Sequence, residues 1–336
     1  MKDFKKMSQK FISIVIPIRN EEKNIEPLFK EIKEVMEGLN TRFEVIFVED
    51  GSIDNSQIVL GGLYHRENDI VKVVMFKRRY GKAAAISAGF EIAKSNFIFT
   101  MDGDLQDAPK EIPKFLTKLD EGYDLISGWK YERKDPLAKK IPSKIFNLVT
   151  SLVTGVKLHD FNCGFKLYRK EVIKHISIYG DLHRYIPVFA HQEGYKVGEV
   201  KIKHRPRIWG KSKYGSSRLL GGFLDLLTVI FLTRFIRKPL HFFGCIGLFM
   251  AFLGFIADIY LTILKLMGEA IGNRPLLLFG NLLIIVGIQF ILMGLIGEMM
   301  SKIFQGQSRE YSVRRYLGIK GGEWASEKDR MKRGKL

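Results

Sequence analysis

Two aspartates in the segment Asp102-Gly103-Asp104 are the residues of this 336-residue chain best suited to chemistry. They follow an apolar run over residues 97–101 and therefore stand at the end of a predicted strand. Two carboxylates spaced in this way can point in the same direction, and Mg²⁺ or Mn²⁺ binds carboxylates together with phosphate oxygens. A lone pair of this kind also occurs among turn residues, but two further acidic segments, 17–22 and 49–54, follow earlier apolar runs. The pattern indicates a metal-assisted reaction of a phosphorylated substrate.

The sequence lacks the two common phosphate-binding loops at these positions. Neither the GxGxxG fingerprint nor the GxxxxGK[ST] loop follows any of the apolar runs. Hard carboxylate oxygens that hold a divalent cation would bind the phosphates instead. Within the second acidic segment, Asp54 is better suited to capping a helix than to binding a ligand, because Asp is a favoured N-cap residue.

Short apolar runs alternate with helix-like segments from residue 11 to about residue 130, which is the pattern of βαβ units. Such units form a parallel, doubly wound sheet, and ligands bind beyond the carboxyl ends of its strands. The acidic segments are therefore predicted to meet at one edge of an α/β domain. The predicted strands are 11–16, 43–48, 71–76, 97–101 and 124–127, and the predicted helices are 22–38, 54–66, 82–94 and 112–121.

Two long apolar segments near the C-terminus predict a transmembrane hairpin. Residues 240–264 and 276–299 each exceed the roughly 20 residues that an α-helix needs to cross a bilayer. Lys and Arg are denser outside the pair than in the loop 265–274, which predicts that both flanks lie in the cytoplasm. Asp258 lies inside the first segment, close to its outer end, where contact with interfacial water is favoured over a functional role.

The basic composition fits a protein beside a membrane. Lys and Arg number 54 against 36 Asp and Glu, a formal net charge of +18. Basic residues near a bilayer are attracted to anionic headgroups, so no nucleic-acid partner is needed to explain the charge. The hydrophobic content of 46% excludes a disordered chain. The two distant cysteines, Cys163 and Cys245, exclude a disulfide scaffold and a zinc module.

These features predict four parts of the chain. Residues 1–215 form a cytoplasmic α/β domain without a cleavable signal peptide, and residues 216–238 form a juxtamembrane amphipathic helix. Residues 239–300 hold the membrane hairpin, and residues 301–336 form a basic cytoplasmic tail. Within the first part, a helix over about 141–155 has apolar residues at helical spacing and suits an interfacial or a core position equally well.

The order of several short motifs resembles that of the family 2 glycosyltransferases that charge a polyprenyl phosphate. The motifs are VIPIRNEE, VEDGSIDNS, GKAAAISAG, MDGDLQD, DFNCGFKLY and HRPRIWGKSKYG, followed by the two membrane segments. Together they cover residues 11–317 and are similar to the dolichol-phosphate mannose synthase-like enzymes, in particular the bacterial undecaprenyl-phosphate glucosyltransferases. The resemblance implies a GT-A type α/β fold with a doubly wound, mostly parallel sheet, followed by the two-helix hairpin.

The resemblance also implies roles for the residues that match the family's motifs. It implies that Asp102, Asp104 and Asp160 are catalytic, that Asp160 acts on the acceptor or holds its loop, and that Asp102, Asp104 and Gln106 bind Mg²⁺ or Mn²⁺. The implied contacts to the nucleotide sugar are Pro17, Arg19, Glu21, Glu49, Asp50, Ser52 and Lys82, with Arg19 in place of the usual Tyr and Glu49 in place of Asp. The implied contacts to the acceptor or diphosphate are Lys130, Arg133, Lys144, Arg207, Ser212 and Lys213, with Lys130 in place of Arg.

The implied reaction moves a sugar from a nucleotide sugar, UDP-glucose or a similar hexose donor, to a polyprenyl phosphate at the bilayer. Direct displacement by the acceptor phosphate, whose second pKa is about 6, would invert the anomeric centre and needs no covalent intermediate. Related enzymes assemble as oligomers, so the resemblance allows a homo-oligomer, although the sequence itself does not indicate an oligomeric state.

One alternative stays open at this point. A catalytically impaired paralogue, acting as a membrane scaffold or as a partner of a lipid-sugar translocase, would tolerate the departures at Arg19, Glu49 and Lys130, although Asp102 and Asp104 are both present. A processive polysaccharide synthase fits poorly, because the chain has neither the QxxRW signature nor a larger helix bundle. A nucleic-acid-binding module fits poorly as well, because the acids at the strand ends would repel phosphate without a metal.

Overall fold

The computed structural model describes residues 10–131, 137–174, 176, 182–206, 228, 231, 235 and 238–305, with only the backbone described at 137–142, 145 and 302–305. The chain forms two compact units, Met1–Arg234 and Phe235–Leu336. The predicted juxtamembrane helix over 216–238 lies almost wholly outside the described residues, and the predicted tail lies outside them from residue 306 onward.

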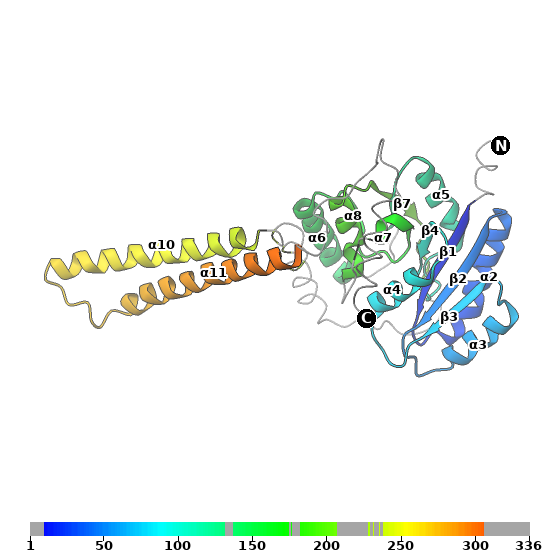
Figure 1. Cartoon of the computed structure of the whole chain (residues 1–336), viewed down its shortest axis with the longest axis horizontal. Helices are drawn as coiled ribbons and strands as arrows, with labels where there is room; N and C mark the ends of the chain where they lie inside the picture. The colour runs from blue at the N-terminus through cyan, green and yellow to red at the C-terminus, as the bar shows by residue number, and fades with distance from the viewer. Residues whose placement is uncertain are drawn as a thin grey trace, which may run out of the picture. The chain divides into compact units, whose positions relative to one another are not determined.

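A mixed sheet of seven strands forms the centre of the first unit (Figure 1). The strand order is β3-β2-β1-β4-β6-β5-β7, and β6 runs antiparallel to both of its neighbours. The other neighbouring strands pair in parallel, so the predicted α/β fold with a mostly parallel sheet is confirmed. The strands are β1 (Phe11–Ile18), β2 (Arg42–Glu49), β3 (Val71–Met75), β4 (Phe97–Thr100), β5 (Leu125–Lys130), β6 (Lys166–Arg169) and β7 (Val197–Ile202).

Helices cover both faces of the sheet, because the central strands bury side chains on both sides. On β1, Ile14 and Ile16 pack toward α2, α3 and α5, whereas Val15 packs toward α4 and α8. A strand that is buried on both faces has a continuous run of apolar residues, and this run allowed β1 to be predicted from the sequence. The helices are α2 (Glu22–Gly38), α3 (Ser56–Arg66), α4 (Lys82–Ile92), α5 (Ile112–Asp120), α6 (Leu137–Thr154), α7 (Lys170–Lys174) and α8 (Ile186–Gln192), with short 3₁₀ turns η1 (Pro109–Glu111) and η2 (Leu182–Tyr185).

Helix α3 begins two residues later than predicted, with Asn55 rather than Asp54 as its N-cap residue. The Asp54 carboxylate still accepts a hydrogen bond from the backbone N–H of Ser56 at 3.0 Å, and a second from that of Glu22 at 3.2 Å. Asp54 therefore ties together the first turns of α2 and α3, the two helices that follow the β1 and β2 loops.

The second unit contains α10 (Pro239–Leu266) and α11 (Pro275–Gln305), which pack against each other. Both are long and apolar enough to span a membrane, with mean hydropathies of 2.1 and 2.5 over their most apolar windows. The two backbones lie so close together that a Cβ at Gly254 would lie only 2.5 Å from the carbonyl oxygen of Gly280. Small residues at such contacts let membrane helices approach each other.

Glu44 on β2 provides a pH-dependent test of the packing. Its buried carboxylate accepts hydrogen bonds from Ser13 Oγ at 2.5 Å and from the backbone N–H of Lys94 at 2.8 Å, and it pairs with Lys72. Burial alone would raise the pKa of Glu44, but these partners outweigh burial and lower it. A carboxylate with a lowered pKa stabilises the folded state above the pKa of the unfolded chain, and this contribution is lost as the pH falls.

We therefore expect Glu44→Gln to reduce the free energy of unfolding at pH 7 by roughly 1–3 kcal/mol. The difference from the wild type should shrink as the pH falls below about 4.5, because the wild-type carboxyl then becomes neutral as well. Denaturant unfolding of the detergent-solubilised chain at several pH values would measure it. A difference that stays constant down to pH values near 3 would contradict this account.

Candidate active site

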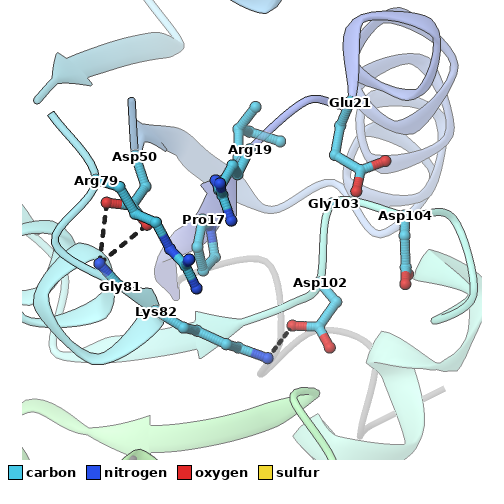
Figure 2. Close-up of a pocket in the computed structure, with 11 residues that line it drawn as sticks. Pro17, Arg19, Glu21, Asp50, Arg79, Gly81, Lys82, Asp102, Gly103 and Asp104 are labelled. Carbon is cyan, nitrogen blue, oxygen red and sulfur yellow. Dashed lines mark hydrogen bonds and ion pairs between the residues drawn. The ribbon is translucent and has the colours of Figure 1, made fainter. Parts of the chain in front are cut away.

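The loops after β1, β2, β3 and β4 converge on one pocket at the carboxyl edge of the sheet (Figure 2). The convergence follows from the topology, since these four strands are parallel neighbours whose ends lie together. Both aspartates of the Asp102-Gly103-Asp104 segment lie in its wall, as the sequence predicted. The lining residues are Pro17, Ile18, Arg19, Glu21, Asp50, Arg79, Gly81, Lys82, Asp102, Gly103 and Asp104.

Asp102 forms an ion pair with Lys82, which stands at the first position of α4. Burial alone would raise the pKa of Asp102, but the ammonium groups of Lys82 and Lys130 outweigh burial and hold it well below its ordinary value. About a quarter of each partner's side chain in the Asp102–Lys82 pair stays exposed, 28% and 24% respectively. Asp102 is thus an ionised carboxylate that a substrate or a cation can reach.

Asp50 positions the loop that carries Lys82. Its carboxylate accepts hydrogen bonds from the backbone N–H groups of Tyr80 at 2.6 Å and Gly81 at 3.0 Å. The next residue, Gly51, has φ +63°, and a Cβ there would lie 2.5 Å from the backbone nitrogen of Arg79. Only glycine allows so close a passage of the two loops, which brings the loops after β2 and β3 together at the pocket.

The carboxylates of Asp102 and Asp104 in the pocket wall suit a divalent cation. Asp104 accepts a hydrogen bond from the backbone N–H of Gln106 at 3.2 Å. The side-chain amide of Gln106, which does not line the pocket, donates to the carbonyl oxygen of Arg205 at 3.4 Å and lies 3.3 Å from Nε2 of His204. Among the described residues, no cluster of three or more His, Cys, Asp or Glu forms a protein cage for a metal. Mg²⁺ does not require one, because it binds one or two carboxylates together with substrate phosphates.

Lys130 lies in a buried part of the same region, with its Nζ 3.1 Å from the Asp107 carboxylate. Burial alone would lower the pKa of Lys130, but Asp107 and the nearby Asp102 raise it, so the ammonium group stays charged. Because β5 alternates its side chains, Lys130 points inward while its neighbours Trp129 and Tyr131 point to the other face. The position is compatible with the predicted contact to the acceptor phosphate.

Asp160 belongs to a loop that packs against Asp102. Its carboxylate accepts a hydrogen bond from the backbone N–H of Asn162 at 3.0 Å, which is a loop-holding contact. Lys166 donates to the carbonyl oxygens of Phe161, at 3.3 Å, and of Cys163. Buried in this loop, the Cys163 thiol has its pKa raised to about 12 and stays protonated. The loop-holding role for Asp160 therefore has a structural basis, and an action on the acceptor stays a prediction.

Several predicted site residues do not line the pocket. Glu49 is fully buried, and its carboxylate accepts from the backbone N–H of Ser52 and, at 2.9 Å, from Gln57. Ser52 accepts from the backbone N–H of Asn20 at 3.0 Å. These contacts shape the turn that presents Asp50. Lys144 is exposed on α6, and Arg133, Arg207, Ser212 and Lys213 lie outside the described residues.

The sequence did not single out Arg79, and it left His183 out of the predicted site because a lone histidine is more often structural. Figure 2 shows the Arg79 side chain reaching into the same space as Arg19 and Lys82. Arg79 follows a predicted strand, so the rule that identified the acidic loops would have found it. His183 is half-buried, and desolvation of its ring, reinforced by the charges of Lys82 and Arg184, lowers its pKa well below the ordinary value. A neutral imidazole therefore lies close to the Asp102–Lys82 pair.

The sequence matches the family described as glycosyl transferase family 2 over residues 13–177. It is 38% identical over 310 residues to a dodecaprenyl-phosphate galacturonate synthase from Rhizobium johnstonii, covering 90% of this chain and 92% of that protein. It is 35% identical over 296 residues to an undecaprenyl-phosphate 4-deoxy-4-formamido-L-arabinose transferase from Pseudomonas fluorescens, covering 88% and 86% of the two chains. Both similarities extend far beyond the family domain.

Solved structures support the fold. Glucosyl-3-phosphoglycerate synthase from Mycobacterium tuberculosis, in complex with Mn²⁺ and uridine-diphosphate-glucose, has a TM-score of 0.54 at 16% identity, covering 69% of this chain and 82% of that chain. The similarity confirms the expected GT-A architecture. The full-length relatives, the family match and the acidic pocket lead to one conclusion: this chain is a family 2 glycosyltransferase and belongs with the enzymes that transfer sugars to polyprenyl phosphates.

Proposed function

We propose that the protein transfers a hexose from a UDP-hexose such as UDP-glucose to a polyprenyl phosphate, with inversion at the anomeric carbon. The observation that carries the proposal is the meeting of Asp102, Asp104 and Lys82 in one pocket with Arg19, Asp50 and Arg79. Its acids suit a divalent cation, and its basic side chains suit a diphosphate. The two relatives are named for different sugars, so the hexose is the part of the proposal that most needs a direct test.

The residues of this chain can position both substrates. A divalent cation bound by Asp102, Asp104 and Gln106 would stabilise the charge that develops on the departing nucleoside diphosphate. Lys82, Arg19 and Arg79 line the same pocket and would neutralise the remaining charge of the diphosphate. The bond from the anomeric carbon to the diphosphate oxygen breaks as a bond to the acceptor phosphate oxygen forms. The acceptor is already largely ionised near pH 7, so positioning replaces a strong general base.

The two apolar helices and the polyprenyl-phosphate relatives support a membrane protein. We propose that the catalytic unit and both termini lie in the cytoplasm. The support is the distribution of Lys and Arg, which are sparse between α10 and α11 and frequent on the outer sides of both helices. Lys130, kept charged by Asp107, is proposed to face the acceptor phosphate.

A donor panel tests the proposal. The purified full-length protein would be incubated with a polyprenyl phosphate, Mg²⁺ or Mn²⁺ and, in turn, UDP-glucose, UDP-galactose, UDP-hexuronic acids, a UDP-pentose and GDP-mannose. We expect a UDP-hexose to give the highest kcat/KM and EDTA to abolish transfer. Preference for GDP-mannose or for the pentose would overturn the donor assignment. Absence of transfer with every donor would favour the impaired paralogue that acts as a scaffold.

Arg79→Ala tests the binding of the nucleotide. We expect the Kd for UDP in the presence of Mn²⁺ to rise about 10-fold, because a charge-assisted contact to the ligand is lost, while the stability of the fold stays unchanged. Isothermal titration calorimetry would measure the Kd. Arg78→Ala is the matched control, since the Arg78 guanidinium packs over the ring of Tyr80 at 4.8 Å and does not line the pocket. Equal effects of the two substitutions would exclude a specific role for Arg79.

A further inference from the structure

An exposed aromatic cluster lies where β5 and β7 end. Trp129 on β5 lies opposite Lys201 on the neighbouring parallel strand, β7. The Trp129 ring stacks on His159 at 3.9 Å and meets the edge of Tyr131 at 5.2 Å, and Lys201 Nζ lies 5.0 Å and 4.7 Å from the centroids of the Trp129 and Tyr131 rings. We name Trp129, Tyr131, His159 and Lys201 the β5–β7 aromatic patch.

The patch is well organised although it is not buried. Tyr131 is 59% exposed, and the His159 side chain is 61% exposed. Glu199, also on β7, accepts a hydrogen bond from the backbone N–H of His159 at 2.9 Å and pairs with its ring. Aromatic rings held in contact at a surface keep a large apolar area exposed to solvent, which calls for an apolar or amphipathic partner.

The patch lies at the same edge of the sheet as the active site. Trp129 and Lys201 precede the last residues of β5 and β7, and the intervening Lys130 reaches inward to Asp107. If the acceptor is a polyprenyl phosphate, its phosphate stays at the membrane surface, so this edge of the sheet must face the bilayer. The inference rests on the proposed function at this step.

The surroundings of the patch have the composition of a membrane-contact surface. Helix α6 exposes Leu148, Val149 and Leu152, and its Asn147 donates to the carbonyl oxygen of His159 at 2.8 Å, so the apolar stripe adjoins the patch. Three exposed lysines lie close to these residues. Lys157 precedes His159 by two residues, Lys201 belongs to the patch, and Lys203 directly follows β7. Trp and Tyr favour the headgroup region of bilayers, and lysines are attracted to anionic lipids.

We propose that the β5–β7 aromatic patch binds the anionic headgroup surface of the bilayer and thereby seats the catalytic unit with its pocket at the membrane. The rings of Trp129 and Tyr131 enter the headgroup region, and Lys201 contacts lipid phosphates. The patch adds a second contact beside the exposed stripe of α6, on a different element of the fold. Two contacts fix the orientation of the catalytic unit on the bilayer, whereas contact through α6 alone would let the unit rotate about the axis of that helix.

Depth-dependent fluorescence quenching tests the proposal on the full-length protein in vesicles. The chain has three tryptophans, so Trp209→Phe with Trp324→Phe leaves Trp129 as the only emitter. In vesicles of phosphatidylcholine and phosphatidylglycerol, we expect nitroxide labels at the headgroup or at carbon 5 of the acyl chain to quench about a third or more of this emission, with less quenching by deep labels.

The matched control moves the probe to the opposite edge of the sheet. Trp129→Phe with Tyr64→Trp, in the same background, places the emitter near the C-terminal end of α3, and we expect no quenching there. Lys201→Glu should at least halve the quenching of Trp129 in vesicles that contain phosphatidylglycerol, whereas Lys94→Glu, after the end of α4, should leave it unchanged.

The outcomes separate this inference from the proposed function. Trp129 emission that no lipid label quenches, in vesicles where the wild-type protein transfers sugar, would overturn the patch assignment and leave the function standing. Quenched Trp129 without any sugar transfer by the wild type would leave the patch standing and reject the function. If no lipid label quenches the Trp129 emission but its wavelength shifts as the protein density in the vesicle rises, the patch contacts a second copy of the chain. This outcome would also overturn the proposal.

Discussion

Asp104→Asn should lower kcat for sugar transfer by about 10³-fold or more, with little change in the stability of the protein. Asparagine keeps the size of the side chain but removes the negative charge that favours a divalent cation. The fold should survive, because the hydrogen bond from the backbone N–H of Gln106 can still be accepted by the amide oxygen. The kcat of transfer and the affinity for Mn²⁺, measured by electron paramagnetic resonance, should fall together.

Asp69→Asn provides the control for this substitution, because Asp69 is exposed and lies away from the carboxyl ends of the strands. We expect its kcat and Mn²⁺ affinity to equal those of the wild type. An Asp104→Asn protein that keeps more than about a tenth of the wild-type kcat would show that the second carboxylate is dispensable for catalysis.

Gly164→Ala should lower kcat about 100-fold through a purely steric effect. A Cβ at residue 164 would lie 2.5–2.6 Å from the carboxylate atoms of Asp102, so the carboxylate must move away from its ion pair with Lys82. The backbone at Gly164 does not have the positive φ that would make alanine strained. The substitution therefore displaces one catalytic group and leaves the chain path unchanged.

Gly61→Ala on α3 is the matched control, since a Cβ there meets no atom within 4 Å. Thermal unfolding of both variants would separate misfolding from misplacement. We expect the Kd for UDP to change less than kcat in Gly164→Ala, because Asp50 and Arg79 stay in place. Wild-type kcat in this variant would mean that Asp102 does not need its observed position.

The sequence predicted the acidic edge of the site well because two local rules coincide there. Strands β1, β2 and β4 are buried on both faces and appear as continuous apolar runs, and the carboxyl ends of neighbouring parallel strands meet. The acidic segments after these strands could therefore be assigned to one edge of the sheet from the sequence alone. The sequence did not predict the pairing of Asp102 with Lys82, since Lys82 begins α4, after a different loop, and the position of that loop depends on Asp50.

The second half of the sheet was harder to predict. Strand β6 has only four residues, and β7 reads VGEVKI, which lacks a long apolar run. Both strands gain their stability from neighbours that are distant in the sequence, such as β4 and β5. Their positions determine where Lys130 and Lys166 lie, and the buried pairing of Lys130 with Asp107 therefore needed the structure.

Formation of a sugar–phosphate–polyprenyl product is the measurement that tests the central claim most directly. Purified protein would receive a labelled nucleotide sugar and polyprenyl phosphate, with free polyprenol and polyprenyl diphosphate as parallel acceptors. Mass spectrometry would identify the lipid product, and a coupled assay would count the released nucleoside diphosphate. We predict one equivalent of nucleoside diphosphate for each phosphodiester-linked sugar, with polyprenyl phosphate as the preferred acceptor. Transfer to polyprenol instead, or release of the diphosphate without any lipid product, would contradict the account.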